Sequence, residues 1–572
     1  MTTISKDTYP WLKHYSDGVP YEINPDAYSS LIDLMETGFK NNADKPAYTS
    51  MGKQITYGKL DELSLKFACY LQSLGLKQGD RIAIQLPNVL QYPIAMLGSI
   101  RAGLVIVNTN PLYTSREMLH QFNDSGAKAI VILANFAVNL EKILANTGIK
   151  HVIITEIGDM LGFPKKQIVN AVLRYVKKMV PAFHLSATTS FNNALSIGEG
   201  FSYKRPNLSG IDVAFIQYTG GTTGVSKGAM LSHRNLIANV EGINEWLMSK
   251  MKHSDYQGQL NMVAPLPLYH VFAMTVNALC GLKWGALNIL IANPRDIPAF
   301  VKELKKYQIH IFPGLNTLFN GLLNNPDFKN LDFRELMISI AGGMALQKVV
   351  AQRWEEVTGC VLVEGYGLSE TSPVLSVSPL DGNHRLGTIG LPFPSTEMRI
   401  LRDDNTWANI GEKGEICAKG PQIMLGYYNR PDETVKVIFE DENGRWFRTG
   451  DIGIEDEDGF FKIVDRKKDM ILVSGFNVYP NEIEEVISQC PGVLEVACVG
   501  IPDEKTGEMV KVFIVKKDPE LTEEKVRTFC KENLTAYKCP KKIEFRTELP
   551  KTNVGKILRR ALREEEMAKK SE

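Results

Sequence analysis

Apolar positions follow two alternating spacings between residues 56 and 343. Residues 56–76 place them at the 3.6-residue spacing of a helix, which Gly75 closes, and residues 92–103 repeat that spacing. Short apolar runs typical of buried strands lie at 80–88, 104–110, 128–135, 151–156, 212–219, 287–292, 309–314 and 336–343. Strands that alternate with helices predict layered α/β subdomains built on parallel sheets.

The pattern changes at about residue 383. Glycines, charged turns and short strands fill residues 383–464 and predict a β-rich subdomain. After a charged break at 465–469, Asn481 and Glu484 have the spacing of a capping box, and Thr522 can cap a second helix. We therefore expect an N-terminal domain over 1–464, which ends in the β-rich subdomain, and a small mobile α+β C-terminal domain over 465–572.

Composition narrows the class of protein. A chain of 572 residues is too long for one ordinary domain. Its 65 basic and 65 acidic residues cancel, so no overall field favours nucleic acid. The eight cysteines form no C-x-x-C pair, which favours free thiols in a reducing cytoplasm over a metal site. The first 18 residues hold no secretory apolar segment, and no apolar run reaches about 18 residues. We expect a soluble cytoplasmic or membrane-surface protein.

Residues 218–228 carry the sharpest local signal. They follow an apolar strand and precede a helix that Ser232 can cap. Glycines allow the backbone to approach an anion, while hydroxyls and one lysine add donors and charge; the set is Thr219, Gly220, Gly221, Thr222, Thr223, Gly224 and Lys227. A flexible surface loop is one alternative. A P-loop is another, but Gly228 follows the lysine where that motif needs Ser or Thr.

This loop resembles the signature loop of the adenylate-forming superfamily, which includes acyl-CoA synthetases and luciferase-like enzymes. Four further segments resemble its other motifs in the same order, at 366–371, 447–451, 465–475 and 550–556. Residues 87–103, 110–118, 293–298 and 444–484 are similar to bacterial long-chain fatty-acid–CoA ligases. Amino-acid-activating adenylation domains usually carry an Asp near the end of the segment at 265–273, which holds none.

The resemblance implies a two-step reaction with fatty acid, ATP and coenzyme A. The acid first forms an acyl-adenylate with release of pyrophosphate, and the CoA thiol then displaces AMP. By the same resemblance Lys556 bridges the carboxylate and the α-phosphate, Glu370 holds Mg²⁺, and His270 lies near the acyl carboxylate. A core histidine, an ordinary acidic residue and a solvated lysine are the alternatives.

The resemblance also assigns the nucleotide and CoA contacts. Tyr366 is expected to stack on adenine opposite the backbone of residues 341–343, and Asp451 to accept from the ribose hydroxyls. The remaining nucleotide contacts are Gly342, Gly343, Gly367, Ser369 and Arg466. Lys468 takes the hinge position, where rotation presents a CoA-binding face made of Ser474, Gly475 and Phe476.

Two surfaces remain open to interpretation. The acyl pocket is expected around Phe272, Met274, Val276 and residues 315–322, with a broad preference for chain length. Residues 164–181 form a basic amphipathic pattern, which fits either a helix in an anionic membrane interface or a surface helix packed on the core. A medium-chain or aromatic acyl-CoA synthetase, and a non-catalytic nucleotide- or lipid-binding protein, stay as alternatives. A homodimer is a further expectation from the family.

Overall fold

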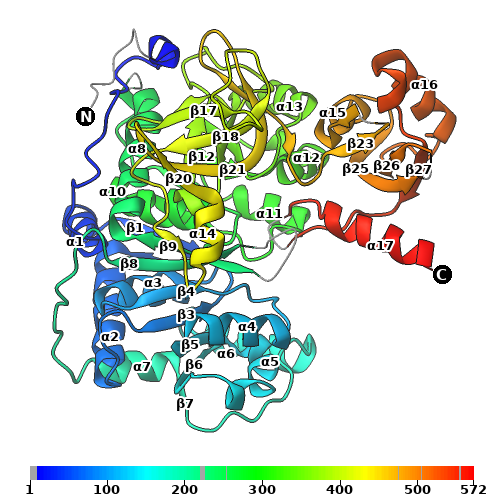
Figure 1. Ribbon diagram of the computed structural model, residues 1–572. Helices are drawn as coiled ribbons and strands as arrows, with labels where there is room; N and C mark the ends of the chain where they lie inside the picture. Colours follow the sequence, from blue (N-terminus) through cyan, green and yellow to red (C-terminus); the bar gives the residue numbers. More distant parts are fainter. Residues whose placement is uncertain are drawn as a thin grey trace.

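The computed structural model describes residues 9–219, 226–252, 254, 256–474, 476–503, 505–552 and 555–571. Figure 1 shows a large body of stacked sheets and helices, with the C-terminal elements forming a smaller lobe beside it. The mixed α/β architecture with a separate small C-terminal part confirms the predicted fold class.

An eight-stranded sheet occupies the first part of the large body, in the order β19-β9-β8-β4-β3-β5-β6-β7. Six of its strands are parallel; at one edge β9 pairs antiparallel with β8, and β19 pairs antiparallel with β9. Its strands are β3 (Arg81–Gln85), β4 (Val105–Asn108), β5 (Ala127–Leu133), β6 (His151–Thr155), β7 (Thr188–Ser190), β8 (Val213–Thr219), β9 (Lys227–Ser232) and β19 (Gly426–Tyr427).

A nine-stranded sheet follows, in the order β16-β15-β14-β13-β12-β10-β11-β1-β2. Its strands are β1 (Pro46–Ser50), β2 (Lys53–Thr56), β10 (Asn261–Ala264), β11 (Leu287–Leu290), β12 (Ile311–Gly314), β13 (Ile338–Gly342), β14 (Leu362–Gly367), β15 (Val374–Val377) and β16 (Leu391–Pro392). The strands predicted from short apolar runs all lie in these two sheets, because parallel strands buried on both faces need continuous apolar sequence.

Helices cover both sheets of the large body. They are α1 (Leu31–Asn42), α2 (Tyr57–Ser73), α3 (Gln91–Arg101), α4 (Ser115–Ser125), α5 (Ala137–Glu141), α6 (Lys165–Ala171), α7 (Phe191–Gly198), α8 (His233–Lys252), α9 (Val271–Ala273), α10 (Cys280–Trp284), α11 (Ile297–Leu304), α12 (Asn316–Leu323) and α13 (Lys348–Thr358). The predicted helix at 56–76 is α2, which Thr56 caps by accepting from the Lys59 N–H at 3.1 Å. No helix among the described residues is long and apolar enough to cross a bilayer.

The β-rich region forms an antiparallel five-stranded sheet. It comprises β17 (Glu397–Leu401), β18 (Gly414–Lys419), β20 (Ile438–Asp441), β21 (Gly444–Glu455) and β22 (Phe461–Arg466), with α14 (Pro431–Val437) beside β20. The sheet therefore begins at Glu397, because β15 and β16 join the nine-stranded sheet instead. The expected domain boundary at residue 465 stays a prediction and falls at the end of β22.

The C-terminal lobe has its own sheet and its own apolar cluster. Its elements are β23 (Ile471–Val473), β24 (Phe476–Val478), β25 (Val493–Asp503), β26 (Gly507–Lys516), β27 (Lys542–Arg546), α15 (Pro480–Ser488), α16 (Glu523–Asn533) and α17 (Arg559–Ser571). Thr522 caps α16 as predicted, by accepting from the Lys525 N–H at 3.3 Å.

One local expectation is confirmed and one is wrong. Ser232 caps α8, by accepting from the Asn235 N–H at 3.1 Å, and between the loop and that helix residues 227–232 form β9, which pairs with β8. The expected capping box at α15 is absent. The N–H of Asn481 donates to the carboxylate of Asp465 at 2.8 Å instead, and Glu484 turns to other partners.

Candidate active site

The sequence motifs meet at the carboxyl ends of β13 and β14. These strands are parallel neighbours that end at Gly342 and Gly367, so their following loops lie at one edge of the sheet. Ligands of open α/β sheets bind at such an edge. A Cβ on Gly367 would overlap the carbonyl oxygen of Pro373, so only glycine fits there. Ser369 and Glu370 lie in the short 3₁₀ helix Ser369–Thr371 that follows.

Asp451, Tyr366 and Arg466 form one connected group. The Tyr366 hydroxyl donates to the Asp451 carboxylate at 2.6 Å, and the Nε of Arg466 lies 3.4 Å from its other oxygen. Asp451 and Arg466 face each other across β21 and β22, which explains why two separate motifs converge. Burial raises the pKa of Asp451, and Arg466 opposes that effect. The ring contact of Tyr366 with adenine stays a prediction.

Lys556 lies against Gly343. A Cβ added to Gly343 would come within 3.1 Å of the Lys556 Cε and 3.4 Å of its Nζ, and Gly343 has a φ of +79°. Only glycine gives the lysine this path over the backbone. Burial first, and Arg466 second, lower the pKa of Lys556 to about 8, whereas Asp451 and Glu370 act in the opposite direction. The structure therefore brings the predicted lysine to the predicted carboxylates.

Glu370 belongs to a polar chain that sequence reasoning did not find. The Tyr427 hydroxyl donates to the Glu370 carboxylate at 2.8 Å, and burial raises the pKa of that carboxyl. The ammonium of Lys227 lies 4.6 Å from the centre of the Tyr427 ring and 2.7 Å from the Glu433 carboxylate. Hydrogen bonds from Lys227 first, and from Lys436 second, lower the pKa of Glu433 to about 2. Lys227 thus connects the end of the phosphate loop to the neighbourhood of Glu370.

His270 lies next to the same edge. Its Nδ1 accepts from the Phe272 N–H at 3.3 Å, which caps α9. Burial lowers the pKa of His270 to about 3, with Lys556 adding to the effect, so the ring is neutral near pH 7. A Cβ on Gly342 would lie 2.9 Å from the Phe272 ring. His270 therefore combines a structural cap with a place beside the lysine.

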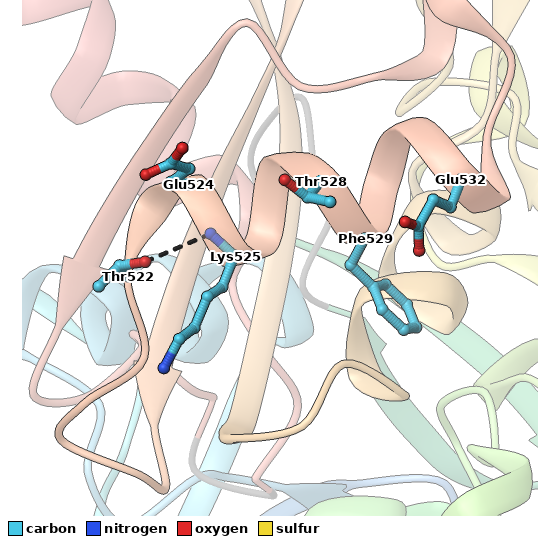
Figure 2. A pocket seen from close by; sticks show the side chains of 6 residues that line it. All are labelled: Thr522, Glu524, Lys525, Thr528, Phe529 and Glu532. Carbon is cyan, nitrogen blue, oxygen red and sulfur yellow. Dashed lines mark hydrogen bonds between the residues drawn. The ribbon is translucent and has the colours of Figure 1, made fainter.

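The expected acyl-pocket residues are largely buried. Met274 and Val276 are in the core, in the π-helical segment Met274–Leu279 that continues α9, and Phe272 is half-buried. The Met274 sulfur accepts from the Asn108 amide at 3.4 Å. A surface hollow of about 440 Å³ lies elsewhere, along α16 (Figure 2). Its lining holds none of the predicted site residues.

The predicted CoA-binding residues lie in the C-terminal lobe. Ser474 has a φ of +50° and its N–H donates to the Thr506 carbonyl at 2.8 Å. The Phe476 ring stacks on Tyr537 with 4.9 Å between centroids and is 56% exposed. Lys468 is exposed in the turn after β22.

Part of the predicted site lies outside the described residues, namely Gly220, Gly221, Thr222, Thr223, Gly224 and Gly475. Thr219 and Lys227, which flank the loop, pair with each other across β8 and β9. The tyrosine at 427 and the acid at 433 carried no recognisable signal, because neither lies in one of the five motifs.

Comparison with known proteins identifies the family. Residues 35–428 match the model of the AMP-binding enzyme family, and residues 482–556 match the AMP-binding enzyme C-terminal domain. The chain is 55% identical over 560 residues to a long-chain-fatty-acid–CoA ligase of Escherichia coli O6:H1, covering 98% of both chains. It is 37% identical over 564 residues to a long-chain-fatty-acid–CoA ligase of Bacillus subtilis, covering 97% of this chain and 98% of that one.

A solved structure shows the same fold. ATP-bound MatB from Rhodopseudomonas palustris aligns with a TM-score of 0.78 and 27% identity, covering 93% of this chain and 98% of that one. The family match covers more than half of the chain. The chain therefore belongs to the adenylate-forming family of AMP-binding enzymes.

Proposed function

We propose that this enzyme is a long-chain fatty-acid–CoA ligase, which converts ATP, a fatty acid and CoA into acyl-CoA, AMP and pyrophosphate. Relatives of that name are 51–55% identical over nearly the whole chain. The observation that carries the proposal is the approach of Lys556 over Gly343 to a cluster that contains Asp451, Arg466 and Glu370. That cluster brings a buried cation to groups suited to a nucleotide.

The first half-reaction needs positive charge at the α-phosphate. A carboxylate oxygen of the acid attacks the α-phosphorus, the bond to the bridging oxygen breaks, and pyrophosphate leaves. Lys556 is largely protonated near pH 7, so its ammonium can neutralise charge on both the acid and the phosphate. Arg466 is cationic beside it and paired with Asp451. His270 is neutral and can offer a hydrogen bond without adding charge.

Glu370 fits a single-carboxylate Mg²⁺ site. It is 7% exposed, its pKa is raised by burial, and an added cation would favour its charged form. Mg²⁺ is usually held by one or two carboxylates together with phosphate oxygens and water, so a single carboxylate suits it. Bound Mg²⁺ supplies charge that offsets the negative phosphates, while Tyr427 keeps the carboxylate oriented.

The second half-reaction needs a different arrangement. The CoA sulfur attacks the acyl carbon, the acyl–phosphate bond breaks, and AMP leaves. Lys556 occupies the region beside Gly343, so we propose that rotation at Lys468 withdraws it and presents the face around Ser474 and Phe476. The exposed Phe476 ring offers an apolar surface to the pantetheine arm.

Pyrophosphate exchange tests the activity. Incorporation of labelled pyrophosphate into ATP should require a fatty acid, and addition of CoA should release AMP and acyl-CoA. A series of acids from medium to long chain, with an aromatic acid beside them, tests the substrate class. Production of ADP, or binding of nucleotide and lipid without exchange, would refute the proposed reaction. A clear preference for the aromatic acid would favour the aryl ligase instead.

We also propose that residues 164–181, together with Phe163 just before them, contact an anionic membrane surface. The segment contains α6 and the π-helical continuation Val172–Val176, and neither has a buried residue. Its exposed apolar side chains include Phe163 at 88%, Tyr175 at 74% and Val176 at 71%. These side chains are available to a membrane surface, while Val169 and Leu173 are half-buried and Arg174 pairs with Glu156. Lys177 and Lys178 are exposed at the end of the segment, where cations suit anionic headgroups.

Vesicle co-sedimentation tests the membrane contact. Glutamate at both Lys177 and Lys178 should reduce binding to anionic vesicles, with a strong dependence on salt. Glutamate at Lys541 and Lys542, an exposed pair in the C-terminal lobe, makes the same change in net charge and serves as the control. Equal loss in both variants, or unchanged binding in the first, would contradict the proposal. A homodimer and a cytoplasmic location stay proposals from the family, and sedimentation equilibrium tests the first.

A further inference from the structure

Arg559 is the first residue of α17 and lies three residues after Lys556. Its side chain is only 14% exposed and contacts several acidic side chains. It contacts Glu484 through two nitrogens, at 2.6 and 2.9 Å, and lies 3.2 Å from Asp465 and 3.5 Å from Asp469. A buried guanidinium with a two-pronged contact fixes its neighbours in direction as well as in distance.

Asp465 connects this arginine to the large body. It lies in β22, opposite Ile452 of β21, and its side chain is fully buried. Its oxygens also accept from the backbone N–H groups of Arg466 at 2.7 Å and of Asn481 at 2.8 Å. The amide of Asn481 contacts Arg559 as well. Both α15 and α17 of the C-terminal lobe are therefore tied to one carboxylate of the five-stranded sheet.

Both members of the Asp465–Arg559 contact are close in sequence to predicted active-site residues. Arg466, the residue after Asp465, pairs with Asp451 at 3.4 Å. The segment with Lys556 has two further hydrogen bonds to the large body: the Thr317 hydroxyl donates to the Gly555 carbonyl at 3.0 Å, and the Arg295 guanidinium donates to the Thr552 carbonyl at 3.4 Å. Both end on neutral carbonyl oxygens, whereas Arg559 and Asp465 are buried and carry opposite charges.

We propose that Asp465 and Arg559 are a positioning pair for adenylation. The ion pair holds the start of α17, and with it Lys556, in the active-site cluster; neither residue touches the reacting atoms. The inference rests on the proposed ligase function. Asp465 precedes Lys468 and Arg559 follows it, so rotation at the proposed hinge separates the two. The pair therefore favours the adenylation arrangement over the thioester-forming one.

The test measures the two half-reactions separately in the full chain. Asp465→Asn keeps the size of the side chain and removes its charge. Arg559→Lys keeps the charge and removes the guanidinium that makes two hydrogen bonds at once. Each should lower kcat for fatty-acid-dependent pyrophosphate exchange by about 10- to 100-fold, the cost of a misplaced catalytic group, with little change in KM for ATP. Thioester formation from supplied acyl-adenylate should be unchanged or faster.

Glu566→Gln is the matched control. It breaks a buried ion pair of α17, between Glu566 and Lys511 at 2.7 Å, that lies wholly within the C-terminal lobe. The proposal would be overturned if Glu566→Gln also slowed exchange while sparing thioester formation. It would be overturned as well if Asp465→Asn slowed both half-reactions equally. A pyrophosphate-exchange rate in Asp465→Asn equal to that of the wild type would also overturn the proposal.

Limited trypsin digestion adds a readout that needs no activity. Lys467 and Lys468 lie exposed in the turn between the two parts. Asp465→Asn should speed cleavage there, because the lobe is released, whereas Glu566→Gln should not. Unchanged cleavage in Asp465→Asn would count against the pair. If the wild type showed no acid-dependent exchange, the ligase function would fail, and the digestion would still decide whether the pair holds the lobe.

Discussion

Replacement of Lys556 by methionine should remove the main cation of the first half-reaction while leaving the shape of the site. Two unit charges about 4 Å apart interact by about 4 kcal/mol at an effective dielectric constant of about 20. Loss of about 3 to 4 kcal/mol of transition-state stabilisation corresponds to a roughly 200- to 1,000-fold slower reaction. Pyrophosphate exchange should fall by that factor, and thioester formation from supplied acyl-adenylate should change by less than about threefold.

The pH profile adds an independent check. The pKa of Lys556 is lowered to about 8, so the ammonium is lost as the pH rises through that value. The kcat/KM for exchange, which reports the free enzyme, should therefore decline above about pH 8. Lys556→Arg should remove the decline, because a guanidinium stays charged. The absolute exchange rate of Lys556→Arg should still be low, since the planar guanidinium does not fit the path over Gly343.

Replacement of Lys556 should raise the stability of the protein although it lowers the activity. A lysine with a folded-state pKa of about 8, against 10.5 unfolded, opposes folding at every pH where both states are protonated. Lys556→Met should raise the free energy of unfolding near pH 7 by at most about 3 kcal/mol, and the gain should vanish above about pH 10.5. Urea unfolding at both pH values measures it. Equal loss of both half-reactions, or a level pH profile through about pH 9.5, would refute the role assigned to this lysine.

Three further changes test the rest of the cluster. Gly343→Ala places a side chain at a φ of +79° against the lysine stem; it should cost about 1 to 2 kcal/mol in a thermal melt and slow exchange more than thioester formation. Asp451→Asn should raise KM for ATP by about 10- to 100-fold, because a charged hydrogen-bond partner of the ribose is lost, and Tyr366→Phe, which removes one hydrogen bond to the same carboxylate, should raise it less. Glu370→Gln should increase the Mg²⁺ concentration needed for half-maximal exchange while thermal stability holds or rises, since burial already disfavours its charge; an unchanged Mg²⁺ titration would contradict the assignment.

Local patterns predicted much of the fold. Apolar runs located β3, β4, β5, β6, β8, β11, β12 and β13 of the two large sheets. Ser232 and Thr522 cap helices as predicted, because each cap needs only a hydroxyl and the N–H three residues later. The capping box at Asn481 failed for the complementary reason. A carboxylate 16 residues away in the chain, Asp465, takes the donor that the local side chain was expected to satisfy.

The sequence by itself determined the motifs, their order and therefore the family, since these are properties of short segments. Only the tertiary structure decided which distant groups act together. Tyr427 reaches Glu370 across 57 residues, and Lys227 reaches Glu433 across 206. Such pairs depend on how β9, β19 and α14 pack, and no periodicity or spacing encodes them. Burial, which sets the pKa of Lys556, likewise exists only once the C-terminal lobe meets the large body.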